Sequence, residues 1–231
     1  MRYLNVNKAV ARLILLQRID LSNYKLKKLR KVFGRYLFTN FISKYFISKS
    51  EINLKYYREM NMEHEVLSKY LNFDDKKILS IGPGMCGLEI IINSKSQNSF
   101  FTIIEKNYVS KKIVYGWDVK NKEGYNNFNL LIDFLSNNEM KNNFEIYNYD
   151  EDDLPNEKFD YVISLYSLDY HYDFSFYSEY LKKVSTEKTK IIFDTVRPNY
   201  FKNLFNYVEE MPSIKKDIHA SKRIICNQFI K

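Results

Sequence analysis

Residues 78–90 read ILSIGPGMCGLEI, a short apolar run followed by a glycine-rich turn and the start of an apolar helical pattern. Three of the six glycines of the chain, Gly82, Gly84 and Gly87, fall within six residues here at the spacing G-x-G-x-x-G. Glycine lets the backbone turn sharply and lets a ligand approach where a Cβ would block it. The stretch therefore predicts a buried strand, a tight turn and a helix whose free N–H groups suit a negatively charged ligand group.

A second apolar run, residues 101–105, ends in Glu105, 23 positions after Gly82. In nucleotide-binding βαβ units, a carboxylate about 20 residues after the glycine turn binds the ribose diol. The alternative is an ordinary strand–helix–strand turn with a solvated glutamate. We favour a nucleotide site because strand, glycines, helix and acid occur in the expected order.

Strands and helices continue to alternate after Glu105. We expect helices at residues 125–135, 174–184 and 199–210, strands at 144–149, 159–165 and 190–194, and a final pair of strands at 214–220 and 223–230 joined by a tight turn. This order predicts an α/β fold with a mostly parallel, seven-stranded sheet and helices on both faces. The final hairpin adds an antiparallel strand.

At 231 residues the chain is long enough for one domain with an appendage. We expect a helical extension or cap at residues 1–60 and the α/β domain at 61–231. Only Cys86 and Cys226 are present, with three histidines, so neither a disulfide framework nor a metal site is expected. The first residues lack the pattern of a signal peptide, and no apolar run reaches the roughly 18 residues of a membrane helix. A cytoplasmic protein is the expectation.

The N-terminal region carries the positive charge of the chain. Residues 1–49 contain twelve lysines and arginines and one acid, whereas the remainder holds 24 basic and 27 acidic residues. The basic residues are interleaved with Leu, Phe and Tyr at helical spacing, Gly34 is expected to kink this pattern, and a further helix is expected at residues 50–71. Such segments bind nucleic-acid phosphates or anionic lipid, which would place the protein at the inner membrane surface. The alternative, favoured at this stage, is a cap whose aromatic face covers the core or a homodimer partner.

The order of elements resembles the class I S-adenosylmethionine-dependent methyltransferases over roughly residues 60–231. Residues 78–87 are similar to the first motif of that family, V-L-D-I-G-x-G-x-G, with Ser80 in place of the usual acid. Residues 150–155, DEDDLP, resemble its D-x-x-x-L-P adenine loop, and residues 159–164, FDYVIS, its F-D-x-V strand. In that family a C-terminal hairpin distinguishes the sheet from that of dinucleotide-binding dehydrogenases.

The resemblance implies S-adenosylmethionine as the cofactor. It implies cofactor contacts at Ser80, Gly82, Gly84, Gly87, Glu105, Asp150, Glu151 and Ser164. For Asp150 and Glu151 a solvated acidic turn is an equal alternative, and Ser80 leaves one expected contact to the methionine amino group in doubt. Residues 164–172, SLYSLDYHY, together with YGW at 115–117 and YN at 125–126, further resemble sugar or small-molecule O-methyltransferases.

A hydroxyl acceptor must lose its proton as it attacks the methyl group, so the chemistry calls for a base. His171 follows the fourth strand, at the sheet edge that normally binds ligands, and a neutral imidazole accepts a proton near neutral pH. Asp169 would orient His171 or act as the base itself. The alternative is a histidine hydrogen-bonded among tyrosines, in a segment where Tyr166, Tyr170 and Tyr172 wall the acceptor site or simply pack.

The leading functional hypothesis is methyl transfer to the hydroxyl of a small molecule, for example a sugar or glycan precursor. An RNA methyltransferase, a small-molecule N-methyltransferase and a non-catalytic, methyltransferase-like binding subunit are the alternatives. Residues 164–167 read SLYS where adenine N-methyltransferases carry N/D-P-P-Y, which argues against adenine N6 chemistry.

Overall fold

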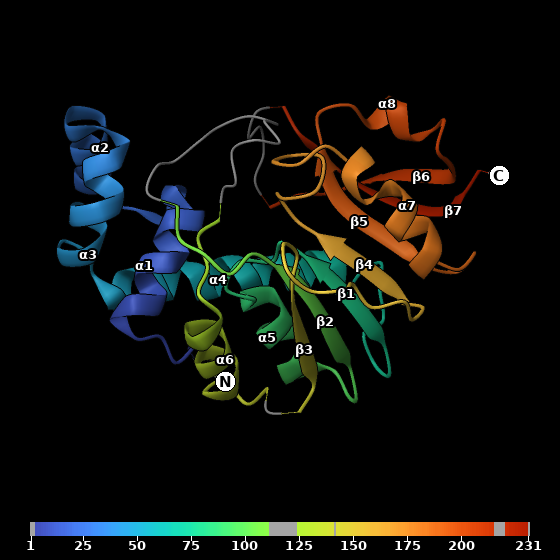
Figure 1. The fold of residues 1–231 in the computed structure, drawn as a ribbon, viewed down its shortest axis with the longest axis horizontal. Coiled ribbons are helices and arrows are strands. Elements are labelled where there is room, and N and C mark those ends of the chain that lie inside the picture. The colour runs from blue at the N-terminus through green and yellow to red at the C-terminus, as the bar shows by residue number, and fades with distance from the viewer. Residues whose placement is uncertain (1–2, 111–123, 141, 215–219, 231) are drawn as a thin grey trace.

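A seven-stranded sheet forms the centre of the computed structural model, which describes residues 3–110, 124–140, 142–214 and 220–230 (Figure 1). The strands are β1 (Lys77–Ile81), β2 (Phe100–Glu105), β3 (Phe144–Asn148), β4 (Tyr161–Ser164), β5 (Lys190–Thr195), β6 (Phe205–Met211) and β7 (Lys222–Phe229). Their order in the sheet is β3-β2-β1-β4-β5-β7-β6. The first five strands are parallel, and β7 lies antiparallel to both β5 and β6. This confirms the predicted fold class.

Helices cover both faces of the sheet. They are α1 (Lys8–Gln17), α2 (Tyr24–Leu37), α3 (Ser43–Tyr45), α4 (Lys49–Leu67), α5 (Gly87–Lys95), α6 (Phe128–Ser136), α7 (Ser175–Val184) and α8 (Pro198–Phe201), with short helical segments η1 (Ile19–Leu21) and η2 (Phe38–Ile42). Within the described ranges, no helix combines the length and the apolar character needed to cross a bilayer.

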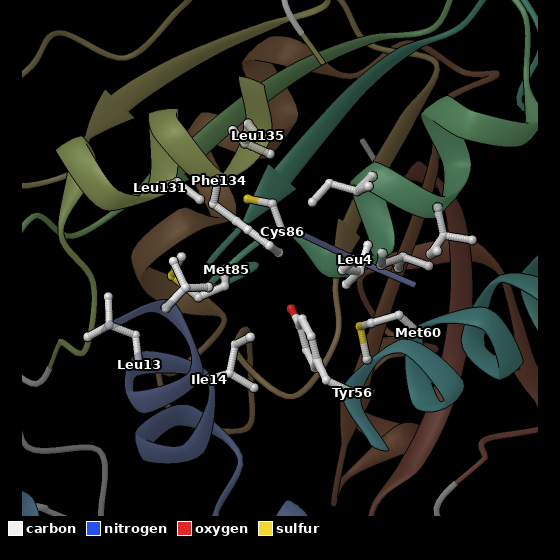
Figure 2. Packing of buried hydrophobic residues seen from close by; sticks show 14 of the residues in the cluster. Leu4, Leu13, Ile14, Tyr56, Met60, Met85, Cys86, Leu131, Phe134 and Leu135 are labelled. Carbon is white, nitrogen blue, oxygen red and sulfur yellow. The ribbon is translucent and has the colours of Figure 1, made fainter. Parts of the chain in front are cut away.

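Side chains of the central strands alternate between two apolar clusters, as the two-residue period of a strand requires. From β1, Ile78 joins the cluster that contains α1, α4, α5 and α6, whereas Leu79 joins the cluster that contains α7 and α8. Figure 2 shows part of the first cluster, where α1, α4 and α6 surround the turn after β1. The central strands β1, β2, β4 and β5 are therefore buried on both faces, which explains their continuous apolar runs.

The N-terminal helices share this core with the sheet. Leu13 and Ile14 of α1 and Tyr56 and Met60 of α4 are buried in the same cluster as Ile78. The predicted domain division at residue 60 remains a prediction. The predicted break at Gly34 is present, since its φ of 75° and ψ of 173° interrupt the helical conformation of α2.

The helix predicted at residues 199–210 is wrong. These residues form only the short α8 and then β6, which pairs with β7 as its antiparallel neighbour. Of the strand predicted at residues 214–220, residues 215–219 lie outside the described residues. The local sequence pattern of residues 199–210 suited a helix. However, β7 pairs with β5 on one side and with β6 on the other, so strand pairing overrides the local helical preference. The helix expected at residues 50–71 is α4, which begins at Lys49 because Ser48 caps it by accepting the Glu51 N–H.

Candidate functional site

The glycine turn after β1 meets the carboxyl end of β2. These ends are adjacent because the two strands pair in parallel, with Ile81 opposite Ile104. The Gly82 N–H donates to the Ile104 carbonyl at 2.9 Å, and the Gly84 N–H donates to Glu105 Oε2 at 2.9 Å. Gly82 and Gly84 have φ angles of 60° and 66°, in the left-handed region that favours glycine. The structure thus brings together the turn and the acid that the sequence singled out.

The Glu105 carboxylate lies in a desolvated setting. Its Oε1 accepts the Lys106 N–H at 2.8 Å, so both oxygens are held by backbone donors. Burial raises the pKa of Glu105 from its ordinary 4.5 to about 7, against the lowering effect of hydrogen bonds from Lys106, Gly84 and the Asn126 side chain. The carboxylate is therefore poised to gain from a further donor, such as a ribose hydroxyl.

The acidic loop after β3 contacts the end of β2 next to Glu105 through one of its two predicted acids. The Lys106 ammonium lies 3.3 Å from Asp150 Oδ1, and above the rings of Tyr149 and Tyr172 at 5.4 and 5.7 Å from their centroids. Glu151 instead accepts the side-chain amide of Asn148 at 2.7 Å. Of the two predicted loop acids, Asp150 is thus the one linked to the neighbourhood of Glu105.

A residue of α1 reaches into the turn. Gln17, the last residue of that helix, accepts the Met85 N–H through Oε1 at 3.1 Å and donates through Nε2 to the Tyr125 carbonyl at 2.7 Å. A Cβ built on Gly84 would lie 2.4 Å from Gln17 Oε1. The buried Asn126 side chain donates to the Gly84 carbonyl at 2.8 Å. The space that glycine leaves at this position is therefore taken by the flexible end of a glutamine.

The other two glycines also face protein atoms. A Cβ on Gly87 would lie 2.5 Å from the Tyr56 ring, and the Gly87 N–H donates to the Tyr56 hydroxyl at 2.9 Å; Figure 2 shows this tyrosine pointing from α4 toward the turn. A Cβ on Gly82 would lie 2.1 Å from Ser167 Oγ. The expected free N–H groups at the start of α5 are thus engaged in part by Tyr56, and Gly87 serves helix packing in this structure.

Ser80 and Cys86 mark the departures from the V-L-D-I-G-x-G-x-G pattern. The buried Ser80 hydroxyl donates to Glu89 Oε1 at 2.8 Å, so the acid missing from β1 has a counterpart on α5. Burial raises the pKa of Glu89. Cys86 stands at the place of the third glycine and adopts a φ of 53°, the conformation that a glycine there would adopt most easily. The Ser80 side chain is therefore bonded to Glu89 of α5 in this structure.

Ser164 ends β4 and connects it to the glycine turn. Its hydroxyl donates to the Ile81 carbonyl at 2.7 Å and accepts the Leu168 N–H at 3.0 Å. This joins the turn after β4 to β1 at the point where the strand order reverses, the usual ligand site of such sheets. The structure gives Ser164 a role in shaping that edge, with its hydroxyl already bonded on both sides.

The two predicted catalytic side chains lie in different surroundings. Asp169 is fully buried, accepts the Thr195 hydroxyl at 2.5 Å and pairs with Arg197, whose Nε lies 3.1 Å from Oδ1. The Asp169 carboxylate is held by these partners, and its role in orienting His171 or as the base stays a prediction. The His171 side chain is exposed and its ring packs edge-on to Tyr170 at 5.0 Å.

A buried ionic network, which the sequence did not reveal, lies beyond the β4 turn. Arg223 of β7 is fully buried and pairs with Glu63 of α4 and with Asp194 of β5, the latter through two contacts of 3.1 Å. Burial would lower the pKa of Arg223, but the two acidic partners raise it. The Tyr166 ring lies 5.4 Å from the Arg223 guanidinium and 5.7 Å from that of Arg18. This network joins α4 to the carboxyl half of the sheet.

Comparisons with known proteins place this topology. The sequence matches no protein-family model and no curated protein. The structure resembles the pyocyanin biosynthetic protein PhzM, with a TM-score of 0.53 and 9% identity over 97% of this chain and 74% of that one. It also resembles a Nostoc punctiforme protein provisionally named an O-methyltransferase, with a TM-score of 0.51 and 10% identity over 96% of this chain and 72% of that one. A third similar structure is a chain from the Haloferax volcanii complex between the Trm112 methyltransferase activator and a provisionally named methyltransferase. The TM-score is 0.50, with 9% identity over 74% of this chain and 90% of that one.

The antiparallel β7, inserted between β5 and β6, distinguishes this sheet from that of the dehydrogenases. This chain has the class I methyltransferase fold. The identities to these structures are low, so the likeness shows the fold, and the reaction has to be inferred from the residues. Three further solved structures give lower TM-scores of 0.44–0.48, and the chain spans only 58–62% of their length.

Within the class I methyltransferase fold, the sequence missed the side chains that come from distant elements. Gln17 and Tyr56 reach the glycine turn from helices 68 and 31 positions earlier in the chain. The one available signal for Gln17 was a glutamine directly after the apolar run of residues 13–16 at the end of a helix. The sequence contained no signal for the buried position of Arg223, because a single arginine in a strand is ordinarily exposed. The predicted YGW resemblance at residues 115–117 lies outside the described residues.

Proposed function

We propose that the chain transfers the methyl group of S-adenosylmethionine to the hydroxyl of a small molecule, such as a sugar or glycan precursor. The hydrogen bond from Gly84 to Glu105 carries the proposal, because it couples the glycine bend to the acid in the class I methyltransferase fold. The structural likeness to a protein provisionally named an O-methyltransferase supports the same reaction class.

The residues at this edge suit an adenosine-bearing donor. Glu105 has spare acceptor capacity and a pKa raised to about 7, so two ribose hydroxyls would stabilise its ionised form. Lys106 and Asp150, whose side chains lie 3.3 Å apart, follow the carboxyl ends of the neighbouring strands β2 and β3. Gln17 occupies the glycine bend through a flexible side chain and would move aside as a ligand approaches Gly84. When bound, the donor would supply an electrophilic methyl group on a sulfonium.

On the acceptor side, the β4 turn supplies the remaining groups. Ser167 lies against Gly82, and its carbonyl accepts the His171 N–H at 2.8 Å, so the histidine is tied to the glycine turn through one residue. In the proposal, a His171 ring nitrogen would take the acceptor proton as the carbon–oxygen bond forms and the methyl–sulfur bond breaks, with the electron pair of that bond left on sulfur in S-adenosylhomocysteine. Asp169 and Arg197 hold the turn that presents this histidine.

Titration calorimetry with S-adenosylhomocysteine tests donor binding. The wild-type chain should bind it, and Glu105→Gln should bind about tenfold or more weakly, because hydrogen bonds to a charged group contribute about 1.5–3 kcal/mol. Glu187→Gln, at an exposed site, is the matched control and should bind like the wild type. Equal affinity for Glu105→Gln and the control would exclude Glu105 as the ribose ligand.

The base assignment needs a separate measurement. With an acceptor in hand, His171→Ala should lower turnover by about 100-fold or more while leaving the affinity for S-adenosylhomocysteine within about twofold. Turnover equal to that of the wild type would remove His171 as the base.

A non-catalytic binding subunit is the second candidate. It is favoured by the side chains of Gln17, Tyr56 and Ser167, which fill the space beside all three glycines of the turn. In addition, two surface hollows among the described residues, one beside Tyr70 and one beside His64, lie at the opposite, amino edge of the sheet. Absence of S-adenosylhomocysteine binding by the folded chain would favour this candidate over the enzyme.

A further inference from the structure

Exposed apolar side chains are concentrated in the segment from residue 24 to residue 46, here called the basic aromatic segment. It comprises α2, η2 and α3, which lie at the end of the molecule remote from β6 and β7 (Figure 1). Half of the sixteen large apolar side chains exposed in the described part of the chain belong to it: Tyr24, Val32, Phe33, Tyr36, Leu37, Phe41, Tyr45 and Phe46. A tenth of the sequence thus supplies half of this surface, which marks an interaction site.

The segment is anchored at a few points and otherwise faces outward. Leu26, Phe38 and Ile42 are buried in the core, and they fix α2 and η2 to the rest of the molecule. The apolar stripe that begins at Leu26 continues along α2 to Phe33, whose side chain is 53% exposed. Of the favoured expectation that the aromatic face covers the core or a homodimer partner, the core accounts for Phe38 but not for the exposed rings, and the homodimer stays a prediction.

Three of the exposed aromatic rings pack against one another. Phe41 packs against Tyr45 at 5.0 Å and against Phe46 at 5.9 Å between ring centroids. Such a group contains more apolar area than a single exposed ring, and aromatic residues with a polar tip are favoured at the boundary of a bilayer.

The charge of the segment is uniformly positive. Residues 24–46 contain seven lysines and arginines and no acidic residue. Lys25, Lys27, Lys28 and Lys31 are exposed along α2, next to the apolar stripe. Basic residues close to a membrane surface each contribute about 1 kcal/mol of attraction to anionic lipid.

We infer that the basic aromatic segment binds the surface of an anionic membrane, with its aromatic side chains at the headgroup boundary and its lysines on lipid phosphates. Single-stranded nucleic acid would use the rings but would gain little from the exposed Val32 and Leu37, which cannot stack on bases. A second copy of the chain would bring two segments of the same charge together, which is unfavourable. The inference is independent of the methyl-transfer proposal.

Vesicle co-sedimentation of the full chain tests it. The protein should sediment with vesicles of phosphatidylcholine containing one quarter phosphatidylglycerol, and only weakly with phosphatidylcholine alone. Raising the NaCl concentration from about 0.1 M to about 0.5 M should release most of it, because screening removes the attraction.

Matched variants separate the two parts of the surface. Lys27→Glu/Lys28→Glu/Lys31→Glu should weaken binding by about 100-fold or more. The control with the same charge change, Lys69→Glu/Lys188→Glu/Lys202→Glu at exposed sites elsewhere, should bind within about fivefold of the wild type. Phe33→Ser/Phe41→Ser/Phe46→Ser keeps all charges and should weaken binding by about tenfold or more, because three exposed rings lose their contact with lipid. Circular dichroism confirms that each variant is folded.

The inference is overturned by any of three results. The first is no binding to the anionic vesicles, or equal losses in the two lysine variants. The second is unchanged vesicle binding by the phenylalanine variant, which would leave only non-specific charge attraction. The third is another partner for the same rings: the wild type does not bind vesicles but forms a concentration-dependent dimer in sedimentation velocity, or binds single-stranded RNA. In that case the phenylalanine variant would abolish the dimer or the RNA binding.

Discussion

The affinity of the chain for an adenosine ligand should depend on pH through Glu105. Its pKa of about 7 lies far above the ordinary 4.5 because the carboxylate is desolvated between the glycine turn and Lys106. A ribose diol donates two hydrogen bonds, and only the ionised carboxylate accepts both without competition from its own proton. The group is an acid, so the binding form dominates above pH 7 and is lost as the pH falls through that value.

The size of the effect follows from the ionised fraction. With a pKa of about 7, roughly one carboxylate in eleven is ionised at pH 6 and roughly ten in eleven at pH 8. The affinity should therefore fall about tenfold from pH 8 to pH 6, a change of about 1.4 kcal/mol.

Methylthioadenosine is the suitable ligand for this measurement, because it lacks the titrating amino acid part of the natural donor. Calorimetry at a series of pH values should give the tenfold fall for the wild type and a flat profile for Glu105→Gln, whose amide does not titrate. A wild-type profile that is flat, or one that persists unchanged in the amide variant, would refute the role assigned to Glu105.

Three further predictions concern the structure around the site. Arg223→Met should lower the free energy of unfolding by about 3–5 kcal/mol in urea titrations, since it leaves two buried carboxylates without their cation. Its neighbour in an exposed pair, Lys222→Met, should change that free energy by at most about 1 kcal/mol, and equal losses would contradict the network. Gly82→Ala should lower the free energy of unfolding by about 2 kcal/mol or more. Adding Ser167→Gly should restore only part of this stability, because the residue-82 φ of 60° remains strained, and full restoration would contradict that. Gln17→Ala should tighten S-adenosylhomocysteine binding about threefold to tenfold, since a hydrogen bond worth about 1 kcal/mol is no longer displaced; weaker binding would show that Gln17 holds the ligand.

The central sheet could be predicted from local patterns. The apolar runs at β1, β2 and β4 are continuous because both faces are buried, and the glycines mark the turn where β1 ends. The proximity of Gly84 and Glu105 followed from the parallel pairing of adjacent strands, which brings their carboxyl ends to one edge. These relations depend on residues close in sequence or on the rule for parallel strands.

Other features depend on contacts that no local pattern encodes. The strand β6 arises from pairing with β7, although its own sequence suited a helix. The carboxylate of Asp169 is held by Thr195, the last residue of β5, and by Arg197 just after that strand, and neither contact is encoded near Asp169 in the sequence. The direction of the aromatic face at residues 24–46 was also open, because helical spacing shows that a face exists and leaves its partner undefined.

A crystal structure of the full chain grown with S-adenosylhomocysteine tests the central claim most directly. The account predicts the ligand at the carboxyl edge of β1 and β2, with both ribose hydroxyls on the Glu105 carboxylate and the Gln17 side chain withdrawn from Gly84. A saturating ligand bound elsewhere, or crystals in which Gln17 still fills the glycine bend and no ligand is present, would contradict it.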